Sequence, residues 1–193
     1  MKVLIVGSGG REHALSWKIS TSPLVKEIFV APGNGGTELE NSVINVDIHA
    51  DDIEGLMQFA LNEQIDLTII GPENPLVNGI TDKFEESGLR CFGPSKGAAQ
   101  LEGSKKFMKD FLKKYNIPTA EYSAFTDPIK AIDYVRKKGC PIVIKADGLA
   151  AGKGVTIANN IDEAKEAIDL ALESEIFGEA GRKIVIEEFL SGE

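Results

Sequence analysis

Two lysines lie in and beside a glycine-rich loop in the second half of the chain, and such groups can bind phosphate. The stretch PIVIKADGLAAGKGVTIA, residues 141–158, places Lys145 at the end of one apolar run and Lys153 within the loop that follows. Glycine amides and lysine ammonium groups are common phosphate ligands in proteins. Lys105 is a further candidate, because it opens a predicted helix, where a lysine opposes the helix dipole.

The loop does not match the Walker loop G-x-x-x-x-G-K-[ST], which opens a helix. Asp147 stands at the place of its first glycine, and Gly154 stands at the place of the hydroxyl residue that binds magnesium. The β-branched run at 155–158 predicts a strand instead of a helix. We therefore expect a glycine-rich hairpin between two antiparallel strands, folded over phosphates.

Three loops in the first hundred residues also follow short apolar runs. They are GSGGRE at 7–12, APGNGGT at 31–37 and GPENP at 71–75. Loops at the carboxyl ends of parallel strands form the binding edge of a sheet, and a helix N-terminus favours an anion. The candidate substrate-binding residues in these loops are Gly9, Gly10, Arg11, Gly33, Asn34 and Glu73.

Simpler interpretations of these loops remain open. The first could be a tight turn without a ligand, the second a flexible crossover, and Glu73 could cap the next helix. A dinucleotide site is disfavoured, because Glu12 replaces the third glycine of the Rossmann fingerprint. In addition, Ala31-Pro32 stands where an acidic ribose ligand would be expected.

The remaining polar residues suggest no other chemistry. Glu187 and Glu188 end an apolar run and could be a charge pair on an edge strand. His13 and His49 lack metal-ligand spacing, although His13 could face the substrate edge. We expect no metal ligands in this chain, and no Ser-His-Asp or Cys-His arrangement can be identified.

Composition is ordinary for a soluble globular protein and is compatible with a small anionic ligand. The chain has 193 residues, 42% of them hydrophobic, and a net charge of −9, which disfavours nucleic acid as a partner. No apolar run approaches the length of about 20 residues needed to span a membrane. Cys91 and Cys140 lie in apolar runs and are expected to be buried, reduced thiols. Together with the lack of a recognisable N-terminal signal, these features predict a cytoplasmic location.

Strands and helices alternate in the first hundred residues, which predicts a Rossmann-like parallel sheet covered on both faces. The expected strands are 3–6, 28–30, 43–46, 67–70 and 90–92, and the expected helices are 11–20, 51–63 and 76–87. A second, smaller α+β unit should follow. Its expected helices are 104–115, 128–138 and 162–173, and its expected strands are 122–125, 141–145, 155–158 and 183–188.

Taken together, these motifs resemble the ATP-grasp superfamily. The resemblance is carried by MKVLIVGSGGREHAL, APGNGGT, GPENPL, GPSKGAAQLEGSKKFMK, IKADGLAAGKGV and VIEEFLSGE, which span nearly the whole chain. Within the superfamily the match is close to the ligases that join glycine to 5-phosphoribosylamine. It implies a substrate-side domain at 1–102, a linking helix region at 103–119 and a small lid subdomain at 120–193.

The resemblance also implies roles for individual residues. Lys105 and Lys145 would contact the ATP phosphates, and the flexible loop over them would contain Gly148, Gly152, Lys153 and Gly154. Glu187 would accept a hydrogen bond from the adenine amino group, the Leu190 backbone would meet the ring, and Glu193 would bind the ribose hydroxyls. The loops at Gly9-Gly10 and Gly33-Asn34 would suit the sugar phosphate.

The implied reaction belongs to purine biosynthesis. ATP, glycine and 5-phosphoribosylamine would give glycinamide ribonucleotide, ADP and phosphate through glycyl phosphate, with magnesium or manganese. Members of the superfamily branch are roughly twice this long, so the metal ligands are expected in an absent C-terminal half. We therefore expect this chain alone not to be a competent ligase, and that half to be a partner. Another ATP-grasp carboxylate–amine ligase or a non-catalytic nucleotide-binding module remains an alternative.

Overall fold

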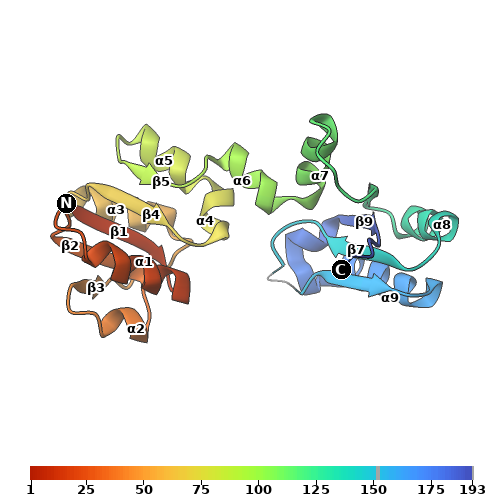
Figure 1. Cartoon of the computed structure of the whole chain (residues 1–193), viewed down its shortest axis with the longest axis horizontal. Helices are drawn as coiled ribbons and strands as arrows, with labels where there is room; N and C mark the ends of the chain where they lie inside the picture. The colour runs from red at the N-terminus through yellow and green to blue at the C-terminus, as the bar shows by residue number, and fades with distance from the viewer. Residues whose placement is uncertain (151–152, 193) are drawn as a thin grey trace. The chain divides into compact units, whose positions relative to one another are not determined.

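The computed structural model describes residues 1–150 and 153–192 and contains two compact units (Figure 1). The first unit is Met1–Ala99 and the second is Gln100–Glu193. The predicted fold class is confirmed, because the first unit contains a parallel sheet and the second an antiparallel one. None of the helices in the described residues combines the length and apolar character that a membrane span requires.

The first sheet has the strand order β3-β2-β1-β4-β5, and all of its strands are parallel. The strands are β1 (Lys2–Gly7), β2 (Glu27–Pro32), β3 (Val43–Asn45), β4 (Leu67–Ile70) and β5 (Cys91–Phe92). The chain order reverses at β1, which lies between β2 and β4. Ligands of such sheets bind beyond the carboxyl ends of the strands at this reversal.

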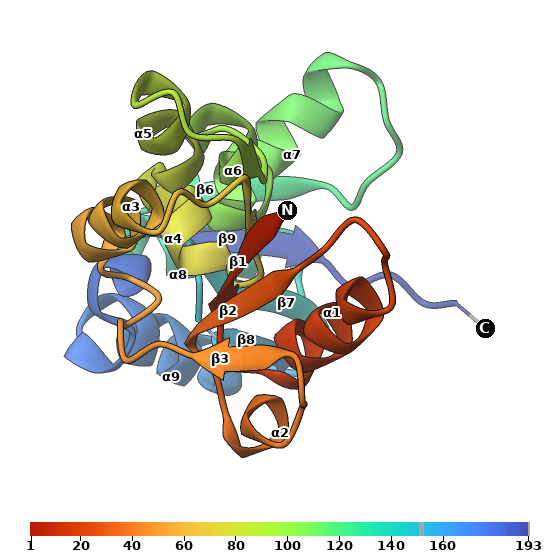
Figure 2. The same ribbon diagram turned by 90° about the vertical axis from the view of Figure 1, so that its left-hand side faces the viewer.

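Helices cover both faces of the first sheet (Figure 2). Successive residues of each buried strand point to opposite faces, so each strand contributes to two cores. Val3 and Ile5 pack with the residues of α1 (Gly10–Ser20), whereas Leu4 and Val6 pack with those of two other helices. These helices are α3 (Ile53–Asn62) and α5 (Ile80–Glu86). Near-continuous apolar strands are therefore required here.

Two expectations for the first unit were wrong. The helix predicted at 76–87 consists of α4 (Glu73–Asn78) and α5, separated by Gly79 with φ 93°. This left-handed conformation ends a helix and favours glycine. The loop predicted at 31–37 contains a short helix, α2 (Gly35–Glu38), whose N-cap is Asn34.

The second unit contains the antiparallel sheet β6-β9-β7-β8. Its strands are β6 (Tyr122–Phe125), β7 (Ile142–Ala146), β8 (Val155–Ala158) and β9 (Ile184–Glu188). Its helical segments are α7 (Lys105–Lys114), α8 (Pro128–Lys138), α9 (Ile161–Leu172) and the 3₁₀ segment η1 (Glu175–Arg182), and α6 (Lys96–Gly103) contains the boundary between the units. The predicted antiparallel pairing of β7 with β8 is confirmed. Neither α6 nor η1 was predicted.

The two faces of the second sheet differ in character. One face packs its aliphatic residues against α8 and α9 in a single apolar core that includes Ile144 and Ile186. Lys145 and Glu187 are the next residues along β7 and β9, so their side chains lie on the opposite face. Tyr122 is paired with Glu187 and shares that face. The sheet thus places a lysine and a glutamate side by side, away from the core.

Candidate functional site

Three charged side chains meet on the face of the second sheet opposite α8 and α9. Lys109 Nζ and Lys145 Nζ each lie 3.0 Å from Glu187 Oε2, and we call these residues the lysine–glutamate cluster. The side chains of Lys109 and Glu187 are only 4% and 6% exposed, whereas that of Lys145 is 25% exposed. Two ammonium groups share one carboxylate, so the cluster carries excess positive charge.

One oxygen of Glu187 lacks a donor. Oε1 is buried and accepts no hydrogen bond from the described residues. Buried carboxylate oxygens are normally hydrogen-bonded, and an unpaired one is an acceptor available to a donor from outside. The predicted role of Glu187 as acceptor for an amino group is compatible with this geometry and stays a prediction.

Lys105 lies close to the glycine-rich loop. Its Nζ donates a hydrogen bond of 2.7 Å to the Gly148 carbonyl oxygen. Burial lowers the pKa of Lys105 below its ordinary value, the charge of Lys145 acts in the same direction, and Asp147 opposes both. Burial and a like charge disfavour the protonated form of a lysine, and an anion that binds beside the ammonium group stabilises that form.

The start of the glycine-rich loop is fastened to the N-terminus of α7. Asp147 accepts hydrogen bonds from the Ser104 hydroxyl at 3.2 Å and from the Lys106 N–H at 3.0 Å. Gly148 has φ +121°, and a Cβ there would lie 2.9 Å from Ala180 Cβ, so only glycine fits without strain. These contacts hold the loop next to the helix that carries two of the lysines.

The rest of the predicted nucleotide site is less defined. The Gly154 carbonyl accepts from the Ala146 N–H at 2.8 Å, and Lys153 is exposed. Leu190 is exposed after β9. Gly152 and Glu193 lie outside the described residues, so their predicted roles stay predictions.

In the first unit a protein carboxylate occupies the glycine-lined edge. The Gly9 N–H donates to Glu12 Oε2 at 2.6 Å, and Glu12 is 3% exposed. A Cβ on Gly7 would lie 2.6 Å from Glu12 Cγ, and a Cβ on Gly71 would overlap the Glu12 carboxylate. The amide predicted to bind an anion is thus already engaged. The sequence revealed Glu12 only as a departure from a fingerprint.

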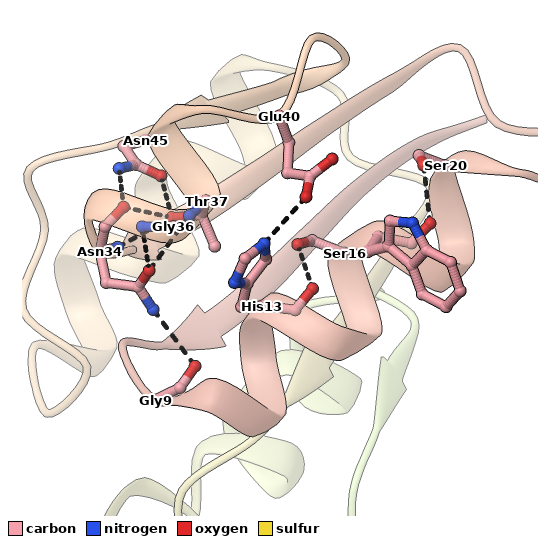
Figure 3. Close-up of polar contacts among 10 residues, drawn as sticks. Gly9, His13, Ser16, Ser20, Asn34, Gly36, Thr37, Glu40 and Asn45 are labelled. Atoms are coloured by element: carbon pink, nitrogen blue, oxygen red, sulfur yellow. Dashed lines mark hydrogen bonds and ion pairs between the residues drawn. The ribbon is translucent and has the colours of Figure 1, made fainter.

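Asn34 is engaged in a similar way (Figure 3). Its Oδ1 accepts from the Gly36 and Thr37 N–H groups at 2.7 and 3.1 Å, and its Nδ2 donates to the Gly9 carbonyl at 3.2 Å. Asn45 Nδ2 donates to the Asn34 carbonyl at 3.1 Å. The side chain predicted to bind substrate therefore caps α2 and ties two loops together.

Two other predicted substrate residues contact each other. Arg11 donates through both terminal nitrogens to Glu73 Oε1 at 3.2 Å, and both side chains are more than 40% exposed, at 59% and 44%. Exposed pairs of this kind contribute little to stability, so a ligand can replace either partner. His13 Nε2 lies 2.9 Å from Glu40 Oε1 (Figure 3).

Lys109 was missed by sequence reasoning. It lies in a lysine-rich helix, and its partners are far away along the chain. One signal was present: Lys109 follows Lys105 by four residues, a spacing that places both on the same side of a helix.

A glycine-rich hairpin beside one buried lysine and two partly buried ones, preceded by a parallel-sheet unit, defines a protein of the ATP-grasp class. The family model for "Phosphoribosylglycinamide synthetase, ATP-grasp (A) domain" matches residues 103–193. The model for "Phosphoribosylglycinamide synthetase, N domain" matches residues 1–102. The chain belongs to the phosphoribosylglycinamide synthetase family, which confirms the resemblance inferred from its motifs.

Individual relatives agree with this assignment. The chain is 61% identical over 193 residues to phosphoribosylamine–glycine ligase of Escherichia coli O6:H1 and covers 45% of that protein. It thus spans less than half the length of this curated relative. The crystal structure of phosphoribosylamine–glycine ligase from Thermotoga maritima matches with a TM-score of 0.78 and 32% identity, over 100% of this chain and 45% of that one.

A more distant protein shares the fold alone. The biotin carboxylase domain of 2-oxoglutarate carboxylase from Hydrogenobacter thermophilus, solved with MgADP, matches with a TM-score of 0.77 and 19% identity. The match covers 98% of this chain and 44% of that one. The architecture therefore persists where most of the sequence has changed.

Proposed function

We propose that this chain is part of a ligase that joins glycine to 5-phosphoribosylamine with ATP, and that its second unit binds the nucleotide. The products would be glycinamide ribonucleotide, ADP and phosphate. The observation that carries the proposal is the convergence of Lys105 and Lys145 beside the glycine-rich loop, where the charge of Lys145 helps to lower the pKa of Lys105. The 61% identity to a phosphoribosylamine–glycine ligase supports the choice of substrates.

The lysines would act by neutralising charge. In the proposed reaction the glycine carboxylate attacks the γ-phosphorus of ATP, ADP leaves, and the amine then displaces phosphate from glycyl phosphate. Negative charge on the phosphates opposes the first step. Fixed ammonium groups in a partly buried site reduce that repulsion and align the phosphates. No covalent protein nucleophile is needed.

The base of the nucleotide would lie towards the end of β9. Glu187 Oε1 would accept from the adenine amino group, and the backbone at Leu190 would meet the ring. The loop containing Gly148, Gly152, Lys153 and Gly154 would cover the phosphates and exclude water from the acyl phosphate. We further propose that residues 120–193 form the lid subdomain and that Glu193 binds the ribose.

We assign the phosphoribosylamine to the first unit, the proposed substrate-side domain at 1–102. The predicted loops contribute Gly9, Gly10, Gly33 and Asn34, but the Gly9 amide and the Asn34 side chain are already engaged. Arg11 is the one cationic residue among the predicted substrate residues. We propose that Arg11 binds the sugar phosphate by exchanging Glu73 for it.

The described residues contain no preformed metal site. In residues 1–150 and 153–192 there is no group of three or more His, Cys, Asp or Glu side chains placed to hold a metal ion. We propose that magnesium, or manganese in its place, is held by the ATP phosphates together with ligands from the C-terminal half expected for the family.

Calorimetric titration with MgATP tests the nucleotide site. Lys145→Ala removes a charged hydrogen bond to phosphate and should weaken binding at least tenfold, since such bonds contribute about 1.5–3 kcal/mol. Lys165→Ala is the matched control, because Lys165 is an exposed lysine of α9. Equal affinity of the wild type and Lys145→Ala, absence of binding to the wild type, or preference for NAD would contradict the proposal.

A further inference from the structure

The two lysines of the lysine–glutamate cluster differ in how firmly they are held. Lys109 Nζ donates to Thr119 Oγ1 at 2.7 Å and to the Ala120 carbonyl at 3.4 Å, and lies 5.8 Å from the centre of the Tyr122 ring. Lys145 is sixfold more exposed, at 25% against 4%, and Glu187 is the only acceptor of its ammonium group among the described residues. Lys109 is therefore fixed in place, and Lys145 is exchangeable.

A single partner would create a conflict at Glu187. If Lys145 alone neutralised this buried carboxylate, moving Lys145 to a phosphate would leave the carboxylate uncompensated, which is strongly unfavourable. Glu187 would then compete with the nucleotide for Lys145. A second, permanent ammonium group removes the conflict, because Glu187 stays paired when Lys145 leaves.

We propose that Lys109 is a positioning residue: it is the permanent counter-ion of Glu187 and thereby frees Lys145 to bind a nucleotide phosphate. Lys109 also holds the carboxylate through Oε2, which leaves Oε1 to accept from the base. Lys109 itself touches no substrate. The inference rests on the proposed nucleotide site, and it explains why a lysine of α7 is buried next to another lysine.

A purely structural role for Lys109 makes a different prediction. Lys109 joins α7 to the segment before β6 and to β9, so its removal should lower stability under either view. Only the positioning role predicts that Lys145 changes its reactivity. The test therefore follows Lys145 directly, in the 193-residue chain without nucleotide.

The probe is pyridoxal 5′-phosphate, a phosphate-bearing aldehyde that forms an imine with lysine amines and is fixed by borohydride. Peptide mass spectrometry gives the labelling of Lys145 relative to Lys165, an exposed lysine of α9. In Lys109→Met, Glu187 retains Lys145 as its sole partner, so labelling of Lys145 should fall about tenfold. Lys109→Arg keeps the charge and should restore it. Lys113→Met, an exposed lysine of the same helix, should have no effect.

The outcomes separate this inference from the proposed function. Unchanged or increased labelling of Lys145 in folded Lys109→Met, as judged by circular dichroism, would overturn the role of Lys109, whether or not the chain binds MgATP. If Lys109→Met does not fold, Thr119→Val removes one hydrogen bond of Lys109 and should lower the labelling in the same direction; no change would overturn the inference. MgATP titration of the same variants then tests the proposed function, with weaker binding expected for Lys109→Met and recovery for Lys109→Arg.

Discussion

The two units use glycine-rich loops for different purposes. In the first unit, Gly7, Gly9 and Gly71 make room for the protein's own buried Glu12 carboxylate. In the second unit, the glycine-rich loop lies beside lysines, and one of them, Lys105, donates to its backbone. The glycine pattern alone marks a place where groups approach the backbone closely, but it does not say which groups.

Charge separates the two cases. A helix N-terminus favours an anion, and in the first unit Glu12 is that anion. In the second unit two lysines share the single carboxylate of Glu187, so one of them can exchange it for an external anion. This difference leads us to place ATP in the second unit and to expect Arg11, instead of glycine amides, to bind the sugar phosphate.

The largest effect is expected from filling the space that Glu12 occupies. Gly71→Ala places a methyl group against the buried carboxylate and should destabilise the first unit by about 3 kcal/mol. Urea denaturation measures this change. Gly35→Ala is the control, because a Cβ at Gly35 meets nothing within 4 Å, and its effect should stay below about 1 kcal/mol. Equal effects of both variants would show that Glu12 does not fill the edge.

A smaller loss is expected at the Asn34 cap. Asn34→Ala should destabilise by about 2 kcal/mol, because the cap of α2 and the hydrogen bond to Gly9 are both lost. Asn160→Ala, which removes the cap of α9 in the second unit, should lose about 1 kcal/mol. Urea denaturation compares the two. A larger loss at Asn160 would mean that Asn34 does not tie the loops together.

The pH dependence of nucleotide binding should reveal Lys105. Burial lowers the pKa of Lys105 below its ordinary 10.5, so its proton is lost before that pH is reached. MgATP affinity should therefore fall as pH rises towards 10.5, by about tenfold for loss of one charged hydrogen bond. Titration calorimetry at several pH values should show a shallower fall in Lys105→Met. If the MgATP affinity of Lys105→Met falls with pH as steeply as that of the wild type, Lys105 is excluded as a phosphate ligand.

The last of these predictions concerns a thiol of the first unit. Burial raises the pKa of Cys91 to about 11, so little thiolate is present near neutral pH. Labelling of Cys91 with a thiol-reactive disulfide should be slow at pH 8 and should accelerate about tenfold per pH unit up to that pKa. A Cys140→Ser background isolates the Cys91 signal. Rapid labelling at pH 8 would indicate that the sheet edge opens.

The fold was predictable where the apolar period was strong. The strand at 3–6 corresponds to β1, because it is an unbroken apolar run that is followed by glycines. The helix at 51–63 corresponds to α3, because its apolar residues recur at helical spacing. The four-residue helix α2 is too short to show a period. The break at Gly79 was hidden because apolar residues continue on both sides of it. Short capped helices and left-handed glycines depend on local contacts, and the spacing of apolar residues does not reveal these contacts.

The site was predictable only where it coincided with local sequence signals. Lys145 ends an apolar run beside a glycine-rich loop, and Glu187 ends another apolar run. Lys109 has partners 10 and 78 residues further along the chain, so only the folded sheet brings them together. Glu12 looked like a defect in a fingerprint, although it is the group around which three glycines pack.

The most direct test of the contrast between the units is a ¹⁵N NMR titration of the 193-residue chain with MgATP. If the second unit holds the phosphates, the largest changes in chemical shift should occur at the amides of Lys145, Gly148 and Glu187. The amide signals of Gly9 and Gly33 should not change. The largest shifts at Gly9, Gly10 and Gly33 would contradict this assignment and would place the nucleotide at the edge where Glu12 lies.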